Sequence, residues 1–307
     1  MGKVEGKVEG KGEIKDYKTA GKLLEQTLSL AKKICKKEVL LLKIAEQLEN
    51  FIEKSRAIRA ALAFPPNLSI NEIAAHYSPF TNDTTVASGL LKVDIGVRVN
   101  DCIADAAISL DLEGSEKNKE LIKTAKEALK AALQVAKPEV EVCEIGKAIE
   151  EKINEFGFRP IYNLTGHEIS KTSLHGGKTI PNYNNNDKTK LEENDVIAIE
   201  PFVTLPNASG SVVNGKPSAI WILKKLQKPR THREIYEWIN KNFNSFPFSQ
   251  RWLKFENASI ALKLFESQGL VYNYPELVEK TGAKVSQAET TIIIKEKPII
   301  LTNIFDI

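Results

Sequence analysis

The stretch KVDIGVRVNDCIADAA, Lys92–Ala107, places two acids, Asp94 and Asp105, inside a run that otherwise has the pattern of buried β-strand. Period-two alternation and β-branched residues predict strands at 92–99 and 103–110 that pair as a hairpin. Residues directly opposite one another in an antiparallel pair point to the same face of the sheet, with Cβ atoms roughly 5 Å apart. We therefore expect both carboxylates on one face.

The position of the turn decides how close the two acids lie. They are directly opposite if the turn is centred between Val99 and Asn100, and they are diagonal neighbours if the turn is Asn100-Asp101. Two ionised carboxylates beside an apolar core repel one another, so at least one takes up a proton unless a base or a cation lies nearby. The hairpin alone leaves a paired base, a protonated acid and a bound cation as alternatives.

Composition excludes several classes of protein. The 307 residues are 42% apolar and 27% charged, which is ordinary for a globular protein with a full-sized core. A net charge of +3, from 43 basic and 40 acidic residues, gives no reason to propose a specific nucleic-acid ligand. Three separated cysteines without a CxxC pair suit a reducing compartment and argue against a thiolate zinc site. With no apolar run near the length of a membrane span, we expect a cytoplasmic protein without a membrane partner.

An internal duplication organises the first half of the chain. Helical patterns at 19–36 and 39–58 return further along, and a gapless shift of 101 positions superposes them: Lys22 falls on Lys123, Leu28 on Leu129, Glu38 on Glu139 and Ile44 on Ile145. That amphipathic helices resemble one another remains an alternative explanation. The continuous register across two helices and their connection favours two α/β halves about an approximate two-fold axis.

Strands follow each pair of helices, so we expect an α+β fold in which paired helices flank a sheet. In the second half, strands are predicted at Asp195–Val203 and Ala288–Thr302. We expect a Gly-Lys-Glu-rich flexible tail at 1–18, a catalytic domain at 19–216 and 283–307, and an inserted subdomain at 217–282.

The inserted segment predicts three short helices, SAIWILKKLQ, HREIYEWINKNF and NASIALKLFESQGL, followed by a small extended tip at VYNYPELVEKTG. This order is typical of a winged-helix module, which admits DNA or RNA binding. No dense arginine cluster marks a recognition helix, so a subdomain that walls one side of a cleft is the preferred interpretation.

Further ligand-type residues lie in apolar or glycine-punctuated surroundings. Glu200 in IAIEPF and Glu289 in SQAETTIII are flanked by residues with a core pattern, and His76, His167 and His175 lie in polar stretches. Each alone fits an acid at a strand edge or a histidine bonded to the backbone. Together, four buried-looking carboxylates with an imidazole predict an oxygen-rich site for a pair of divalent ions, which favours Mn, Fe or Co.

Five motifs in order, AFPPNLSINEIAAHYSP, KVDIGVRVNDCIADAA, NLTGHEISKTSLHGGKTIP, IAIEPF and QAETTI, resemble methionine aminopeptidase of type 2, from about residue 19 to the end. The resemblance implies the duplicated pita-bread fold and, without a long Lys/Glu-rich extension, the archaeal form. Thr165 in NLTGH departs from the asparagine of some relatives, which affects the surroundings of the ligands but leaves the ligands in place.

The resemblance also implies roles for single residues. Asp94 resembles a two-oxygen ligand of one ion, Asp105 and Glu289 resemble bridging carboxylates, and His167 and Glu200 resemble the other ligands of a dinuclear centre holding two divalent ions (Co, Mn, Fe or Zn). His76 and His175 resemble catalytic histidines that contact substrate and donate hydrogen bonds near the scissile amide, and Tyr274 matches a residue of the methionine pocket.

The implied activity is metal-dependent removal of the N-terminal methionine from nascent polypeptides, with a small second residue preferred. A ribosome contact and a monomeric state go with it. Two alternatives remain: a prolidase or aminopeptidase P of the same fold, and a relative that binds RNA or protein without catalysis. The first usually carries an additional amino-terminal domain, and the second loses metal ligands, whereas all five positions here hold competent side chains.

Overall fold

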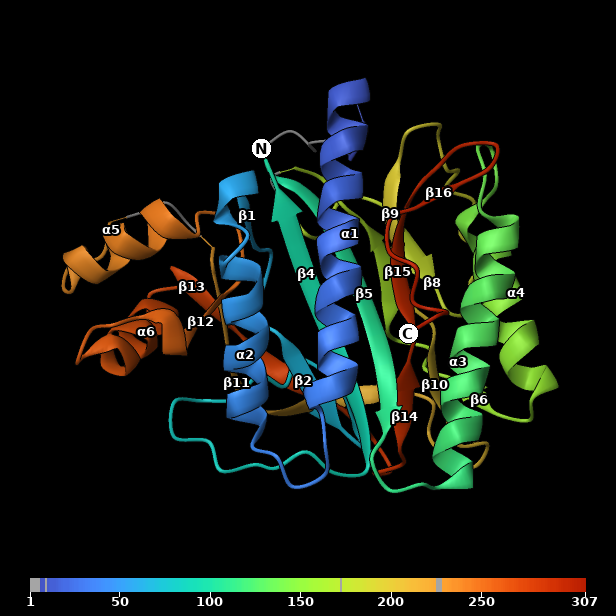
Figure 1. Ribbon diagram of the computed structural model, residues 1–307, viewed down its shortest axis with the longest axis horizontal. Coiled ribbons are helices and arrows are strands. Elements are labelled where there is room, and N and C mark those ends of the chain that lie inside the picture. Colours follow the sequence, from blue (N-terminus) through green and yellow to red (C-terminus); the bar gives the residue numbers. More distant parts are fainter. Residues whose placement is uncertain (1–5, 9, 172, 225–227) are drawn as a thin grey trace.

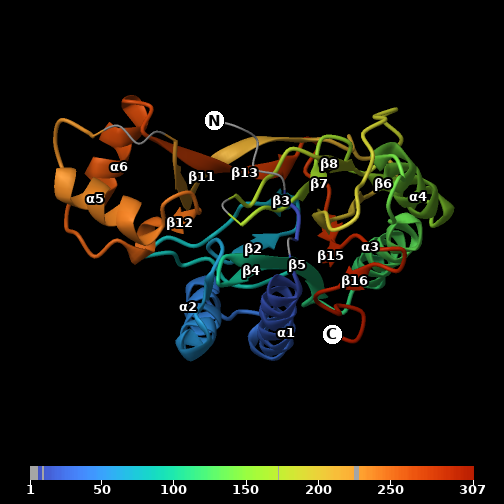
Figure 2. The same cartoon turned by 90° about the horizontal axis from the view of Figure 1, so that it is seen from above.

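The computed structural model describes residues 6–8, 10–171, 173–224 and 228–307. A large sheet is covered on one side by four helices, and a hairpin and two further helices lie on its other side and beyond its edge (Figures 1 and 2). The helices are α1 (Lys11–Ile34), α2 (Leu41–Glu53), α3 (Glu116–Val135), α4 (Val142–Glu155), α5 (Arg233–Asn242) and α6 (Ala258–Ser267), with 3₁₀ turns η1 (Arg56–Ile58) and η2 (Gln250–Trp252). No helix among the described residues is long and apolar enough to span a membrane.

The main sheet has nine strands and brings the two halves of the chain together. Its path runs β1-β4-β5-β15-β9-β7-β8, with β2 beside β4 and β16 beside β15. These strands are β1 (Ala60–Leu62), β2 (Asn67–Ile70), β4 (Leu90–Val99), β5 (Cys102–Asp111), β7 (Thr165–Glu168), β8 (Thr179–Pro181), β9 (Val196–Ile199), β15 (Glu289–Ile293) and β16 (Ile299–Ile300). Because β15, near the end of the chain, pairs with both β5 and β9, it joins the first half to the second.

Two smaller sheets complete the fold. One has the order β14-β10-β6 and the other β12-β11-β13-β3. Their strands are β3 (Ile73–Ala75), β6 (Arg159–Pro160), β10 (Phe202–Thr204), β11 (Val212–Leu223), β12 (Phe248–Ser249), β13 (Val271–Glu279) and β14 (Val285–Gln287).

The β4–β5 hairpin resolves the question of its turn. Val99 pairs with Cys102, so the two-residue turn is Asn100-Asp101, and both turn residues have positive φ, 47° and 66°. Such φ values match a type I′ turn, whose twist suits an antiparallel hairpin and which accepts Asn and Asp. In this register Gly96 lies opposite Asp105 and Ala107 opposite Asp94, so the two acids are diagonal neighbours.

The duplication is visible in matching backbone contacts. Glu38 and Glu139, which are 101 positions apart, both have a φ of 68° and both lie within the connection between paired helices, three residues before the second helix begins. The Glu38 N–H donates to the Ala87 carbonyl, and the Glu139 N–H donates to the Leu191 carbonyl, each 2.9 Å away. Equal strain and equal contacts at equivalent positions confirm the two-fold repeat.

Two predicted strands are each divided in the structure. The run 195–203 separates at Glu200-Pro201 into β9 and β10, which belong to different sheets, because proline cannot donate to a ladder. The run 288–302 separates into β15 and β16, which pair antiparallel through Ile292 and Ile300. Pro298 lies in the connection between them, which a continuous strand would not tolerate.

The amino-terminal segment differs from the expected tail. Helix α1 begins at Lys11, ahead of Thr19, and Tyr17 is only 1% exposed. The Val8 N–H donates to the Asn194 carbonyl at 3.0 Å, so the segment is bound to the second half of the chain. The Lys- and Glu-rich composition gave no helical signal here, because tertiary contacts stabilise this part of the helix. The first five residues and residue 9 lie outside the described residues.

The inserted segment begins and ends in a long hairpin. The sequence predicts a helix over SAIWILKKLQ, but Ser218–Leu223 belong to strand β11, which pairs with β13, and residues 225–227 of this run lie outside the described residues. The extended tip is strand β13 itself, whose inner end pairs with β3 of the catalytic part. The other two predicted helices are α5 and α6, which pack with β11 and β13 around a separate core centred on Tyr236, Phe248 and Phe265. The β-branched and aromatic residues of the first run favour a strand once a partner strand is available.

Candidate metal centre

All eight residues singled out in the sequence line one cavity between the main sheet and the β11–β13 hairpin. Figure 2 shows this hairpin on the side of the sheet that faces away from α1 and α2. The eight are His76, Asp94, Asp105, His167, His175, Glu200, Tyr274 and Glu289. The apolar neighbours Phe64, Ile220, Leu174 and Pro247 complete the wall.

Five candidate ligands come from five successive strands of the sheet. Asp94 lies on β4, Asp105 on β5, Glu289 at the start of β15, Glu200 directly after β9, and His167 on β7. These strands are neighbours in the order β4-β5-β15-β9-β7. Because side chains of paired strands on one face lie side by side, the sheet itself brings together residues that are distant in sequence.

The ligand atoms are close enough to share a cation. One ligand atom each from Asp105, His167 and Glu289 lies within 4.8 Å of the others. The Nε2 atom of His167 is 3.8 Å from Asp105 Oδ2 and 3.8 Å from Glu200 Oε1. Asp105, His167 and Glu289 are only 3%, 7% and 2% exposed, so bulk solvent screens their charges poorly.

The electrostatics of the four carboxyl groups call for a counter-charge. Desolvation raises the pKa of Asp94 to about 7. Desolvation, followed by the charges of Asp94 and Glu200, raises the pKa of Asp105 well above its ordinary value. The pKa values of Glu200 and Glu289 are raised in the same direction, again by desolvation first and by neighbouring carboxylates second. A divalent cation allows all four groups to ionise.

Unpartnered buried oxygens provide a separate test of whether this site fits a metal. Among the described residues, Asn67 Oδ1, Asp94 Oδ1, Asp105 Oδ1 and Gln287 Oε1 are buried and have no hydrogen-bond partner. Asn67, Asp94 and Asp105 line the cavity, and Gln287 donates to two of the candidate ligands beside it. Because buried polar atoms are normally satisfied, this group of oxygens fits a site that binds a cation. Oxygen atoms with one imidazole nitrogen suit hard or intermediate divalent ions.

His76 and Tyr274 lie together at one side of the cavity. Their rings meet edge to face, with centroids 5.3 Å apart, and His76 Nδ1 is 3.3 Å from the Pro275 carbonyl oxygen. His76 has a φ of 67°, a strained value for a non-glycine residue that is often found at functional sites. Desolvation lowers the pKa of His76 to about 4, so its imidazole is neutral at pH 7.

His175 lies at the cavity's solvent side, against the candidate ligand His167. The two rings have centroids 4.5 Å apart, and His175 is the exposed member of the pair. The loop that carries it is anchored by Glu168: the Gly177 N–H donates to Glu168 Oε2 at 2.7 Å, and the Gly176 N–H donates to the Glu168 carbonyl. His175 is therefore positioned from the same strand that carries His167.

The sequence reasoning missed Gln287 and Thr291. The Gln287 amide donates to Glu289 Oε2 at 3.0 Å and to Glu200 Oε2 at 3.4 Å. Thr291 Oγ1 accepts from the Asp105 N–H and donates to the Asp105 carbonyl, both at 2.8 Å. Thr291 lies two positions from Glu289 in β15, so the period of two was a signal that could have found it. Gln287 ends the preceding strand β14, also two positions from Glu289.

The amino-acid sequence matches the model of metallopeptidase family M24 over residues 15–222. The chain belongs to metallopeptidase family M24. Two archaeal relatives are named methionine aminopeptidase. That of Pyrococcus abyssi is 40% identical over 292 residues, covering 92% of this chain and 97% of the relative, and that of Methanocaldococcus jannaschii is 37% identical over 298 residues, covering 94% and 99%.

Solved structures agree on the M24 fold. A thermophilic Arx1 superposes with a TM-score of 0.85 at 19% identity, covering 96% of this chain and 92% of that one. Methionine aminopeptidase from Rickettsia prowazekii superposes at 0.69 with 19% identity, covering 97% and 99%. A prolidase from Pyrococcus furiosus gives 0.61 at 17% identity, covering 96% of this chain but 65% of the prolidase. At these identities the likeness shows the fold alone.

Membership of family M24 means that this chain is a hydrolytic metallopeptidase that uses divalent metal. The prolidase-like alternative is the more distant one. The prolidase from Pyrococcus furiosus is 17% identical to this chain, whereas the two archaeal methionine aminopeptidases are 40% and 37% identical.

Proposed function

We propose that this protein is a type 2 methionyl aminopeptidase that removes the N-terminal methionine from nascent proteins and peptides. The observation that carries the proposal is the convergence of Asp94, Asp105, His167, Glu200 and Glu289 from five neighbouring strands into one cavity beside two further histidines. The names of the archaeal relatives support the substrate class.

The five ligands would hold two divalent ions, drawn from Co, Mn, Fe or Zn. Asp94, Asp105, Glu200 and Glu289 would supply oxygen ligands, and His167 would supply a nitrogen ligand. Divalent ions at such a site supply Lewis-acid chemistry, which lowers the pKa of water and polarises a carbonyl group. Gln287 orients Glu200 and Glu289 through its amide donors.

His76 would act by hydrogen bonding rather than by charge. A neutral imidazole whose Nδ1–H donates to the Pro275 carbonyl leaves Nε2 as an acceptor, so His76 would accept a hydrogen bond from the scissile amide or the departing amine. This differs from the donor role that the resemblance implied. His175, on the other side of the cavity, would remain the donor toward the developing oxyanion.

The apolar wall would bind the methionine side chain. Phe64, Ile220 and Pro247 offer contacts of the right chemistry, and the Tyr274 ring, edge to face with His76, would close the pocket. Contact between the cavity wall and the residue after the scissile bond would restrict the size of that residue. Peptides with Gly, Ala or Ser in second position should be cleaved faster than those with Lys or Trp.

The decisive experiment is a metal-dependence assay on a short methionyl peptide. Chelator-treated protein should be inactive on Met-Gly-type peptides and should regain activity with Mn, Fe or Co, alongside a direct metal count. An Xaa-Pro dipeptide serves as the control substrate. Cleavage of that dipeptide instead would support a prolidase, and RNA binding without any hydrolysis would support a non-catalytic relative.

Finer features of the proposal concern the setting of the enzyme. Nascent-chain substrates imply action in the cytoplasm, as a monomer, with the winged-helix-like inserted segment free to contact the ribosome. Co-sedimentation with ribosomes tests the contact, and light scattering tests the monomeric state. A stable dimer would contradict the second expectation.

A further inference from the structure

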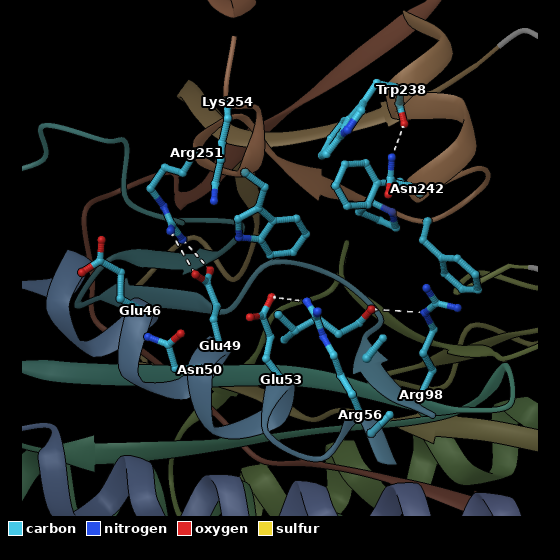
Figure 3. Close-up of a pocket in the computed structure, with 17 residues that line it drawn as sticks. Glu46, Glu49, Asn50, Glu53, Arg56, Arg98, Trp238, Asn242, Arg251 and Lys254 are labelled. Atoms are coloured by element: carbon cyan, nitrogen blue, oxygen red, sulfur yellow. Dashed lines mark hydrogen bonds and ion pairs between the residues drawn. The ribbon is translucent and has the colours of Figure 1, made fainter. Parts of the chain in front are cut away.

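A groove of about 650 Å³ separates the catalytic part from the inserted segment beside the metal centre (Figure 3). One wall is formed by α2 and β1, and the other by α5 and the segment 246–254. Pro247 lines both this groove and the metal-centre cavity. The segment around Pro247 is buried: Phe246 belongs to the main core, and Phe248 and Ser249 pair with Trp221 and Ile220 of β11. This ladder joins the segment to the inserted hairpin, and contacts across the groove join it to the catalytic part.

Arg251 bridges the groove near this wall. Its Nη1 and Nη2 donate to the two carboxylate oxygens of Glu49 on α2, at 3.1 and 2.6 Å. Its Nε donates to the Pro79 carbonyl at 2.7 Å. The side chains of Arg251 and Glu49 are only 6% and 11% exposed, although they lie beside a groove.

The same segment is held at its other end by Arg98 of β4. The Arg98 guanidinium lies over the Phe246 ring, 4.5 Å from its centroid, while its Nε donates to the Leu62 carbonyl. Phe246 and Arg251 thus flank Pro247, and each is fixed by a contact to the catalytic part. Of the two, the Arg251 contact is the stronger because it is bidentate and charge-assisted.

Arg251 connects three segments that build the substrate cavity. It belongs to the inserted segment, it pairs with α2, and it bonds Pro79, three residues after His76. We propose that Arg251 is a positioning residue, which through Glu49 and Pro79 fixes both the Pro247 wall of the methionine pocket and the strained backbone at His76. The proposal rests on the proposed function, because it assigns these two features to substrate binding and turnover.

Arginine is required for this geometry. Three fixed N–H donors reach two different elements, whereas the lysine ammonium is a point charge without the planar fork. Arg251→Lys keeps the charge and loses the fork. The matched control is Arg56→Lys, because Arg56 pairs with Glu53 in the same groove at 3.3 Å but is exposed, with 75% and 55% of the two side chains accessible (Figure 3).

The kinetic experiment compares kcat and KM of both variants on a Met-Ala peptide, together with metal content and thermal unfolding. Misplacement by about an ångström costs up to roughly a hundredfold, so we expect Arg251→Lys to lower kcat/KM on the order of tenfold or more, with KM raised and metal content unchanged. Arg56→Lys should stay within about twofold of wild type. A lowered unfolding temperature with unchanged kinetic constants would overturn the proposal.

The double variant Arg251→Met, Glu49→Leu separates positioning from stability. Replacing a buried ion pair by apolar side chains is often neutral for stability, yet it removes the donor to Pro79. We expect a stable protein with the same loss of kcat/KM. A stable double variant with wild-type kinetics would show that the ion pair only joins the two parts.

Hydrogen exchange tests the inference without relying on catalysis. Arg251→Lys should speed amide exchange in 77–83 and 246–253, while Arg56→Lys should leave both segments unchanged. If wild-type protein fails to cleave methionyl peptides, the proposed function fails, and this measurement still decides whether Arg251 positions the cavity wall. The same amide exchange rates in both variants over 77–83 and 246–253 would contradict the positioning role of Arg251.

Discussion

At the scale of single residues, the candidate metal centre places each acid where burial would otherwise protonate it. Asp105 and Glu289 are almost inaccessible, and Asp94 and Asp105 retain unpartnered oxygens among the described residues. Such groups are costly unless they bind a cation. The strained φ of His76 is a second local cost. These costs at residues 76, 94 and 105 mark the site more clearly than any single motif does.

His167 and His76 should respond differently to removal. His167→Ala should lose bound metal, because its Nε2 lies 3.8 Å from two ligand carboxylates, whereas His76→Ala should keep its metal and lose turnover. Loss of a group that stabilises the transition state costs roughly 10²–10³ in kcat. Elemental analysis of both variants, with wild type as reference, measures this; equal metal loss in the two would reverse their roles.

Gln287 should affect metal affinity although it is no predicted ligand. Gln287→Met preserves the volume but removes the donors to Glu200 and Glu289, and loss of such a group typically weakens metal binding roughly 10–100-fold. Gln268→Met, at an exposed position at the end of α6, is the control. Competition against a fluorescent chelator gives both affinities, and the same affinity for both variants would exclude this role.

At the scale of elements, the repeated helix pairs fix the sheet between them. Helices α1 and α2 match α3 and α4 in order and in connection, including the left-handed residues Glu38 and Glu139. The β4–β5 hairpin, through its Asn100-Asp101 turn, then determines which residues face the cavity, because a slip by one residue would move every side chain to the other face.

The two left-handed glutamates provide a matched stability test. Glu38→Gly and Glu139→Gly should each leave stability unchanged or raise it by about 0.5–1 kcal/mol, since glycine adopts φ near +68° without Cβ strain. Alanine at the same positions keeps the strain and is the control for loss of the side chain. Urea unfolding of the four variants measures this, and opposite signs at the two positions would contradict their equivalence.

At the scale of the whole molecule, the site exists only where the halves and the inserted segment meet. The main sheet supplies the five candidate ligands, β3 and the loop after β7 supply the histidines, and the inserted segment supplies Tyr274, Ile220 and Pro247. Metal binding therefore links elements from along the described chain, and its free energy adds to the stability of the folded state.

Chelation should lower the unfolding temperature, and more so at higher pH. Without metal, the folded pKa of Asp94 is raised from 3.8 to about 7, so the stability present below pH 4 is lost as pH rises toward 7. The other three carboxyl groups shift in the same direction. Metal should restore about 2.7 kcal/mol at a hundredfold excess over Kd.

Calorimetry of chelated and metal-loaded protein at pH 5 and pH 8 measures this difference. The difference in unfolding temperature between the two forms should be larger at pH 8 than at pH 5, because the chelated form loses stability as pH rises. A gap that narrows with rising pH would contradict the predicted protonation of the buried carboxyl groups.

The sequence by itself determined the elements whose pattern is local. The β4–β5 hairpin and the four helices of the repeat follow from alternation and amphipathic periodicity, and the eight candidate site residues follow from these patterns together with the resemblance to a known family. Tertiary structure decided what depends on partners distant in sequence. Ser218–Leu223 became strand because β13 lies beside them, residues 11–18 became helical as part of α1, which packs on β4 and β5, and Pro201 divided a strand between two sheets. Arg251 carries no signal in sequence, since its role arises only when α2 and the Pro79 carbonyl come within hydrogen-bond distance. Local secondary-structure propensity contributes little free energy per residue, so burial against a segment distant in sequence overrides it.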